Sequence, residues 1–374
     1  MHKKKHTDRR QAIIHLGQLG SLFLGLGAFN AWAKTQSPAA SQPVSKSVAD
    51  GVSEKQSSTH PERLIRPDAS FSEPLDHTLW NPATKRKIGI RIRLPEVKDK
   101  TGLIIYSPGL GSGLNNGAPW CEAWCKAGFV VVTLSHPVTN DEIWDTAKQS
   151  LKANLRDALA FPQYGLRVTD CKFIIDACLA DPDLGNFIDS ERIGIAGHSY
   201  GALTVQSIAG QTSSKTSLAD PRIKAAIAFS PTAMSLAAAT SMKSINMPFF
   251  CVMGDHDNYV TFTNGMDSKR LGVELSKRKY VYKGLPPGRR EQLVLSNADH
   301  MSFAGENLSS TPPKFSRDLP ITTEQENKTW KKISETTTLF WQANLGKNVS
   351  AKVPKKYQEA MRMMLDKEDE YTAD

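Results

Sequence analysis

A serine with one glycine two positions before it and another two positions after it is the first candidate reactive residue in this sequence. Ser199 lies in the pentapeptide 197–201, GHSYG, directly after the apolar run 193–196. A strand that turns sharply into a helix holds such a serine in a strained backbone conformation, with its hydroxyl exposed at the end of the strand. Gly197 and Gly201 leave room for neighbouring backbone to approach this turn. We call residues 197–201 the elbow, and the pattern predicts a nucleophilic serine.

A serine nucleophile needs a base to accept its proton and an acid to orient that base. His300 follows the last apolar run, 292–295, and Asp257 follows the run 248–253. The chain order serine, acid, histidine is the one expected when the elbow lies in an open, mostly parallel sheet. We therefore expect Ser199 to act as nucleophile, His300 as base and Asp257 as the orienting acid.

Two other aspartates are alternative acids. Asp255 directly follows Gly254, where an aspartate usually bonds to nearby backbone N–H groups and holds a turn. Asp299 adjoins His300 in sequence, and neighbouring side chains seldom point toward each other. Asp257 lies three residues beyond the glycine and has the longer reach.

The negative oxygen that forms during attack on an ester needs hydrogen-bond donors. One expected donor is the backbone N–H of Tyr200, which follows the nucleophile. The other is expected at Leu110, in the glycine-rich residues 107–111, which we call the oxyanion segment.

Three further histidines lie near the ends of predicted strands. His198 is expected to pack inside the elbow or to make a minor substrate contact, and His256 to lie in an exposed loop. His136 follows a strand, where it either lines the site or holds a turn.

The elements that would position these residues alternate between apolar strands and helices. The strands are predicted at 87–94, 103–106, 129–134, 193–196, 223–229, 248–253 and 292–295. The first alternates apolar and polar residues, as an antiparallel edge strand does, whereas the others are mostly apolar, as buried parallel strands are. Helices are expected around Trp120 and Trp124, at 166–179, within 264–278 and at 322–345, and the polar residues 138–165 are expected to rise above the sheet. This pattern predicts an α/β fold with helices on both faces of the sheet and the site at its carboxyl edge.

Charge gives little support for nucleic-acid binding. Of the formal net charge of +9 in the 374 residues, residues 1–33 contribute four units, through five basic residues and Asp8. The remaining excess shows no stripe of arginine and lysine interleaved with aromatic residues, so no nucleic-acid partner is expected.

The first 33 residues have the pattern of an export signal. A basic start ends in Arg9-Arg10, an apolar stretch spans 12–29, and Ala31-Trp32-Ala33 fits a cleavage site between small residues. The paired arginines resemble a twin-arginine signal. We expect export to the periplasm or the medium, with an uncleaved membrane anchor as the alternative, and a disordered linker at 34–63.

Five cysteines leave at least one thiol unpaired within the chain. The pairs Cys121/Cys125 and Cys171/Cys178 lack the additional cysteines or histidines of a zinc site. We expect small buried thiols and neither metal nor cofactor.

The region from about Trp80 to Leu345 resembles the bacterial α/β-hydrolases described as predicted dienelactone hydrolases, and is similar to the plasma-type platelet-activating-factor acetylhydrolases. The motifs that carry the resemblance are YSPGLGS at 106–112, GFVV at 128–131, DxxRIG at 189–194, GHSYGA at 197–202, LPPG at 285–288 and DHMSF at 299–303. The resemblance implies a serine esterase that works without a metal.

Three departures from these families bear on the site. Dienelactone hydrolases carry cysteine where this chain has Ser199, and the oxyanion segment has Pro108-Gly109 in place of the usual His-Gly. In the acetylhydrolases the acid occupies the position of Ser230. Serine cannot serve as the acid, so in this chain the acid is expected after the next strand.

Together these features predict a single α/β-hydrolase domain at 64–346 with a charged helical tail at 347–374. No large cap domain is expected, because the segment between Phe229 and Pro248 is short. The expected reaction is hydrolysis of small-molecule carboxylic esters with small acyl groups through an acyl-enzyme, at a site roofed by residues 138–165 and 304–320.

Two alternative functions stay open at this point. One is an acetylhydrolase or phospholipase A-like enzyme that acts on short-chain phospholipids at a lipid surface, which exposed aromatic residues near Trp144 would support. The other is a catalytically silent binding protein with the same fold. Membrane contact is expected only at such a lipid surface or through an uncleaved N-terminus.

Overall fold

The computed structural model describes residues 63–65, 73–97, 99–213, 216–264, 267–306, 315–317, 319–347 and 355–374. The predicted export signal (1–33) and nearly all of the predicted linker lie outside the described residues. Leu64 and Ile65, near the start of the described residues, are buried in the core. No helix among the described residues is both long enough and apolar enough to cross a membrane.

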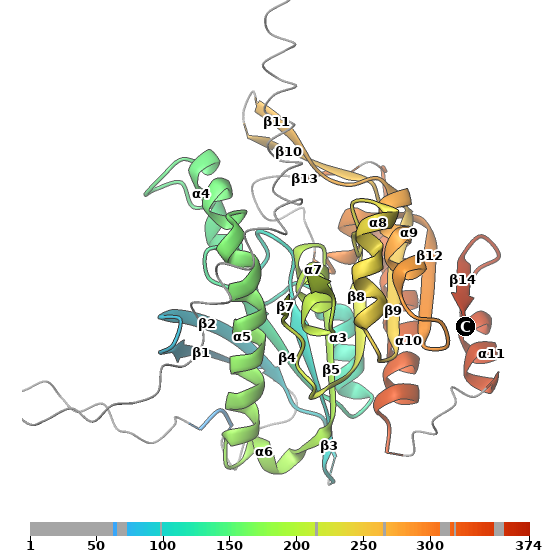
Figure 1. Cartoon of the computed structure of the whole chain (residues 1–374), viewed down its shortest axis with the longest axis horizontal. Helices are drawn as coiled ribbons and strands as arrows, with labels where there is room; N and C mark the ends of the chain where they lie inside the picture. Colours follow the sequence, from blue (N-terminus) through green and yellow to red (C-terminus); the bar gives the residue numbers. More distant parts are fainter. Residues whose placement is uncertain are drawn as a thin grey trace, which may run out of the picture.

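A nine-stranded sheet runs through the molecule (Figure 1). Its strand order is β1-β2-β4-β3-β5-β8-β9-β12-β14. The strands are β1 (Leu75–Asn81), β2 (Arg86–Arg93), β4 (Val130–Ser135), β3 (Thr101–Ser107), β5 (Ile188–His198), β8 (Ile223–Phe229), β9 (Phe249–His256), β12 (Arg290–Asp299) and β14 (Glu370–Ala373). The six strands from β4 to β12 are mutually parallel, and β1, β2 and β14 join the two ends of the sheet in antiparallel pairing.

Helices cover both faces of this sheet, as predicted. On one face, α3 (Ala118–Lys126) and α10 (Thr323–Leu345) bury a cluster of aromatic side chains that includes Trp120, Trp124 and Trp341. On the other, α5 (Phe161–Ala180), α7 (Tyr200–Ile208) and α9 (Leu275–Gly284) pack on the aliphatic side chains of the strands. The central strands are apolar on both faces because both faces are covered.

The shorter elements lie in the connections. They are η1 (Asp141–Trp144), α4 (Leu151–Ala158), α6 (Leu184–Phe187), β6 (Thr212–Ser213), β7 (Thr216–Ser217), α8 (Leu236–Ala239), η2 (Thr240–Ser244), β10 (Tyr259–Asn264), β11 (Asp267–Gly272), η3 (His300–Phe303), β13 (Phe315–Ser316) and α11 (Lys355–Met363). Only α8 and η2 lie between β8 and β9, so no cap domain is inserted there. The α4 helix and the β10–β11 hairpin project from the same end of the molecule (Figure 1).

Three predicted elements differ from the structure. The helix predicted within 264–278 begins only at Leu275, because the β-branched and aromatic residues of 259–264 form one strand of a hairpin. Residues 87–94 do not form an edge strand, since β2 pairs with both β1 and β4. Among the described residues of the tail, only Lys355–Met363 are helical, and Glu370–Ala373 form β14, which covers the free edge of β12.

The five cysteines are free thiols, as expected. Cys121, Cys171, Cys178 and Cys251 are buried and Cys125 is partly buried. Each serves as a small apolar side chain in the packing of the sheet and its helices.

Candidate active site

Ser199 occupies the turn between β5 and α7 in a conformation that few residues other than glycine adopt, with φ 56° and ψ −109°. Its N–H donates to the carbonyl of Phe229, 3.0 Å away. The two elbow glycines permit close approach of β3, because a Cβ would lie 1.8 Å from Ser107 O at Gly201 and 2.6 Å from it at Gly197. The elbow is therefore held between the ends of two neighbouring strands.

His300 begins η3, directly after β12. Its Nε2 lies 2.9 Å from Ser199 Oγ, and its Nδ1 lies 2.7 Å from Asp257 Oδ1. The structure thus brings the three predicted residues, Ser199, His300 and Asp257, into one chain of hydrogen bonds. This chain lies at the carboxyl ends of β5, β9 and β12, where open α/β sheets form their sites.

The two alternative acids face elsewhere. Asp255 is partly exposed and accepts hydrogen bonds from the His256 ring, at 2.8 Å, and from the Ala298 N–H, at 3.2 Å. Asp299 caps η3, where its Oδ1 accepts from the Ser302 N–H at 2.9 Å. Of the three aspartates, only Asp257 is fully buried and bonded to the histidine.

Sequence reasoning missed two residues that surround the acid. Ser230, at the end of β8, donates from its hydroxyl to Asp257 Oδ2 at 2.5 Å. Arg278, a buried residue of α9, places Nε 2.9 Å from Asp257 Oδ1 and donates from Nη1 to the Ser230 carbonyl at 2.8 Å. No local pattern marks Arg278. Ser230 had a signal, since the resemblance to the acetylhydrolases places their acid at this position.

The charge state of Asp257 follows from these neighbours. Burial acts to raise the pKa of its carboxyl group. The positive charge of Arg278, the contact with His300 and the hydrogen bond from Ser230 outweigh burial and lower the pKa to about 2. Asp257 is therefore an ionised carboxylate that can hold the imidazole and stabilise its protonated form.

The oxyanion segment follows β3 and lies against the elbow, so that a Cβ at Gly109 would be 3.3 Å from His198 Nδ1. The Gly111 N–H donates to Thr139 O at 2.8 Å, and the Gly111 carbonyl accepts from the Trp144 indole at 2.7 Å. The N–H groups of Leu110 and Tyr200 donate no hydrogen bond to any described residue. Both groups thus keep their capacity to bind a substrate oxygen.

The other histidines do not take part in the hydrogen-bond chain. His198 is buried behind His300, donates from Nε2 to the His300 carbonyl at 3.1 Å, and has its pKa held well below the usual range by burial and by His300. His136 is fully buried and does not line the site. Burial lowers its pKa to about 4, and its ring joins Ser107 to Asp170. His256 is exposed, as expected.

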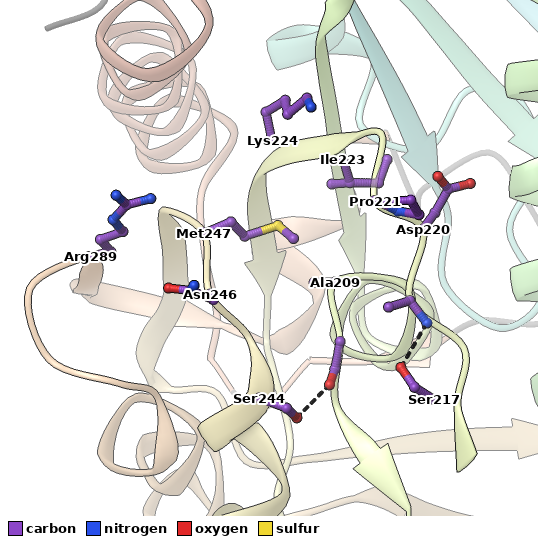
Figure 2. Close-up of a pocket in the computed structure, with 12 residues that line it drawn as sticks. Ala209, Ser217, Asp220, Pro221, Ile223, Lys224, Ser244, Asn246, Met247 and Arg289 are labelled. Carbon is purple, nitrogen blue, oxygen red and sulfur yellow. Dashed lines mark hydrogen bonds between the residues drawn. The ribbon is translucent and has the colours of Figure 1, made fainter. Parts of the chain in front are cut away.

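A pocket of about 400 Å³ lies at the other end of the sheet (Figure 2). Many of its lining residues lie at the start of β8, β9 or β12, and they include Asp220, Ile223, Lys224, Met247 and Arg289. Because Ser199 lies at the opposite ends of the strands, this pocket is not the substrate site. In the described ranges, no three His, Cys, Asp or Glu residues are grouped so that they could hold a metal ion.

Residues 185–278 match the sequence model of the family described as Serine hydrolase (FSH1). The matched stretch contains the elbow, Asp257 and Arg278, and His300 lies beyond it. The described residues have the α/β-hydrolase fold that the sequence predicts. The strand order, the elbow and this partial match together support hydrolase chemistry at Ser199.

Two solved structures illustrate the likeness in fold. A dienelactone hydrolase from Anabaena variabilis is 13% identical, with a TM-score of 0.48 over 73% of this chain and 99% of that chain. A 2,6-dihydroxy-pseudo-oxynicotine hydrolase is 16% identical, with a TM-score of 0.43 over 61% of this chain and 62% of that one. No curated protein sequence matches this chain.

Proposed function

We propose that this chain is an exported serine esterase that hydrolyses carboxylic esters with small acyl groups through an acyl-enzyme. The observation that carries the proposal is the continuous hydrogen-bond chain from Ser199 Oγ through His300 to the ionised Asp257. This geometry activates a hydroxyl that is otherwise a weak nucleophile.

In the proposed first half-reaction, Ser199 Oγ attacks the ester carbonyl carbon while its proton passes to His300 Nε2. The carbonyl oxygen becomes negative and accepts hydrogen bonds from the Leu110 and Tyr200 N–H groups. When the intermediate collapses, the ester C–O bond breaks and the alcohol leaves with the proton from His300. Water then repeats the sequence on the acyl-enzyme, releasing the acid and restoring the Ser199 hydroxyl.

The preference for small acyl groups is argued from the roof of the site. Leu110 and Trp144 pack with Ile143, Leu151 and Leu155 in a small apolar cluster over the oxyanion segment. Such a cluster closes one side of the site, and no inserted domain builds a long acyl tunnel. Trp144 bonds to Gly111 and is partly buried, which does not favour the lipid-surface alternative.

Export is proposed from the sequence of residues 1–33 alone. N-terminal sequencing of protein recovered from the cell envelope or the medium is expected to begin at or near Lys34. A start at Met1 would favour the membrane-anchor alternative.

The decisive experiment replaces the nucleophile. Ser199→Ala is expected to abolish both ester hydrolysis and labelling by a fluorophosphonate, with a change in stability of less than about 1 kcal/mol, because only one oxygen is lost. Ser235→Ala, which removes the cap of α8, is the matched control and should keep both properties. A folded Ser199→Ala variant that retained most activity would refute the mechanism, and a wild type that neither reacts nor labels would favour the silent binding protein.

Substrate preference is tested with aromatic esters from acetyl to dodecanoyl, beside a short-chain phospholipid. An apolar groove contributes roughly 0.8 kcal/mol for each buried methylene, so a long groove would appear as rising kcat/KM with chain length. We expect the highest kcat/KM for the shortest acyl groups. A steady rise toward dodecanoyl would contradict the proposal.

A further inference from the structure

A fully buried arginine lies beneath the oxyanion segment. Arg167, on α5, donates to the Pro108 carbonyl and, at 3.0 Å, to Ser107 Oγ. It also donates to Thr139 Oγ1 at 2.6 Å and to Thr204 Oγ1 at 3.1 Å. One side chain from a helix on the face of the sheet thus holds the end of β3, the start of the oxyanion segment and the helix that follows the elbow.

The same guanidinium group also contacts the elbow itself. Its central carbon lies 4.7 Å from the centre of the Tyr200 ring, a cation–π distance. Arg167 therefore touches Tyr200, whose N–H is one expected donor to the oxyanion. It also bonds to the Pro108 carbonyl, two residues before the other expected donor, Leu110.

A second path leads from Arg167 to the far side of Leu110. Thr139 Oγ1 accepts from Arg167, and the Thr139 carbonyl accepts from the Gly111 N–H at 2.8 Å. The Pro108–Gly109 and Leu110–Gly111 peptide groups are thus both restrained, and both restraints begin at the same guanidinium group.

The charge of Arg167 is unusual for a purely structural residue. Among the described residues no carboxylate forms an ion pair with it, because Asp170, one turn along α5, pairs with Arg86 and His136. Burial lowers the pKa of Arg167 to about 10, which leaves it charged at neutral pH. Burial of a cation without a carboxylate partner lowers the stability of the fold. The same cation beneath a site where negative charge develops stabilises the transition state of the reaction.

We propose that Arg167 is a positioning residue of the oxyanion hole. It holds the Pro108 carbonyl and the Tyr200 ring so that the N–H groups of Leu110 and Tyr200 converge on one substrate oxygen. This inference rests on the proposed esterase function. Because the oxyanion exists only after attack has begun, the loss of Arg167 is expected to lower kcat and leave KM nearly unchanged.

The test uses Arg167→Lys in the full-length protein, with Arg93→Lys as the control. Arg93 is also buried, but it bonds to Thr133 on β4, away from the oxyanion segment. Arg167→Lys is expected to lower kcat at least tenfold with KM within about twofold of wild type, while Arg93→Lys keeps both. Affinity for a trifluoromethyl ketone, whose adduct places an oxyanion in the same hole, should fall by the same factor as kcat/KM.

A second variant keeps the test valid if Arg167→Lys does not fold. Thr139→Val leaves Arg167 in place and removes one of its acceptors, and it is expected to lower kcat several-fold. A folded Arg167→Lys variant with wild-type kcat and inhibitor affinity would overturn the inference and leave the esterase function standing. If Arg167→Lys does not fold, a wild-type kcat for Thr139→Val would overturn it equally. A wild-type protein without esterase activity would overturn both proposals.

Discussion

Three side chains around the candidate site hold Asp257 in place. His300 and Ser230 bond to its two carboxylate oxygens. Arg278 lies against the carboxylate and donates from Nε to the Asp257 backbone carbonyl at 2.7 Å. These groups come from β8, α9 and η3, so the carboxylate is oriented by three separate elements. An acid held in this way keeps the imidazole in one tautomer during repeated proton transfer.

The first prediction concerns this acid. Asp257→Asn is expected to lower kcat by about 10³–10⁴, because the amide keeps the shape of the carboxylate but favours the wrong tautomer of His300. Asp255→Asn is the control, since Asp255 is partly exposed and bonds to His256 and the Ala298 N–H. Steady-state kinetics on the two folded variants decides the assignment, and a larger loss for Asp255→Asn would reverse it.

The second prediction concerns the partner of the acid. Arg278→Leu leaves a buried carboxylate without its cation, and removal of one member of a buried pair costs about 3–5 kcal/mol. Arg91→Leu breaks an ion pair with Asp76 that is partly exposed and should cost less than about 1 kcal/mol. Urea unfolding of both variants measures the difference. Equal losses would show that Asp257 does not depend on Arg278.

At the scale of elements, the elbow and the oxyanion segment form one unit. The carbonyl of Ser107, the last residue of β3, lies against both elbow glycines, and the oxyanion segment continues directly from that residue. Any displacement of the end of β3 therefore moves the expected donor at Leu110 relative to Ser199.

The third prediction follows from this contact. Gly201→Ala would place a Cβ 1.8 Å from Ser107 O, and relief of that overlap requires backbone movement. We expect a loss of about 3 kcal/mol or more in the free energy of unfolding, together with lower kcat. Gly89→Ala, whose Cβ would lie 3.2 Å from Ser135 Cβ, should cost less than about 1 kcal/mol. Similar effects of the two substitutions would contradict the close approach at the elbow.

At the scale of the whole molecule, the C-terminal residues complete the sheet. Glu291, on β12, is buried and accepts hydrogen bonds from Tyr357 on α11, at 2.9 Å, and from Tyr371 on β14, at 2.7 Å. Burial raises the pKa of Glu291 to about 7, although the two tyrosine hydroxyls act to lower it. One buried carboxyl group of the domain thus bonds to both α11 and β14, and its pKa lies near neutral pH.

The fourth prediction is a pH dependence of stability. An unfolded glutamate releases its proton near pH 4.5, whereas folded Glu291 keeps it to about pH 7. The folded state therefore binds more protons in this window, and the free energy of unfolding falls as the pH rises through it, by an amount on the order of 3 kcal/mol. Glu291→Gln cannot ionise, so at pH 8 it should be more stable than wild type by up to that amount.

Denaturant unfolding at several values between pH 4.5 and pH 8 measures this difference. Glu368→Gln, at an exposed position of the same tail, is the control and should leave the pH dependence unchanged. A constant difference between wild type and Glu291→Gln across the range would contradict the titration of Glu291.

The sequence by itself determined the features that depend on local pattern. Apolar runs mark the parallel strands, and the glycine spacing of the elbow marks the sharp turn at Ser199, because steric limits act between close neighbours in the chain. The order of Ser199, Asp257 and His300 along the chain likewise places each residue after its own strand.

Only the tertiary structure decided which groups meet across the chain. Arg278 reaches the acid from a helix that follows an unpredicted hairpin, and Arg167 reaches Pro108 across 59 positions of sequence. β14 pairs with β12 because the open edge offers unpaired backbone groups, although its own residues read as part of a charged helical tail. Such contacts depend on how separate elements pack, and no local periodicity records that packing.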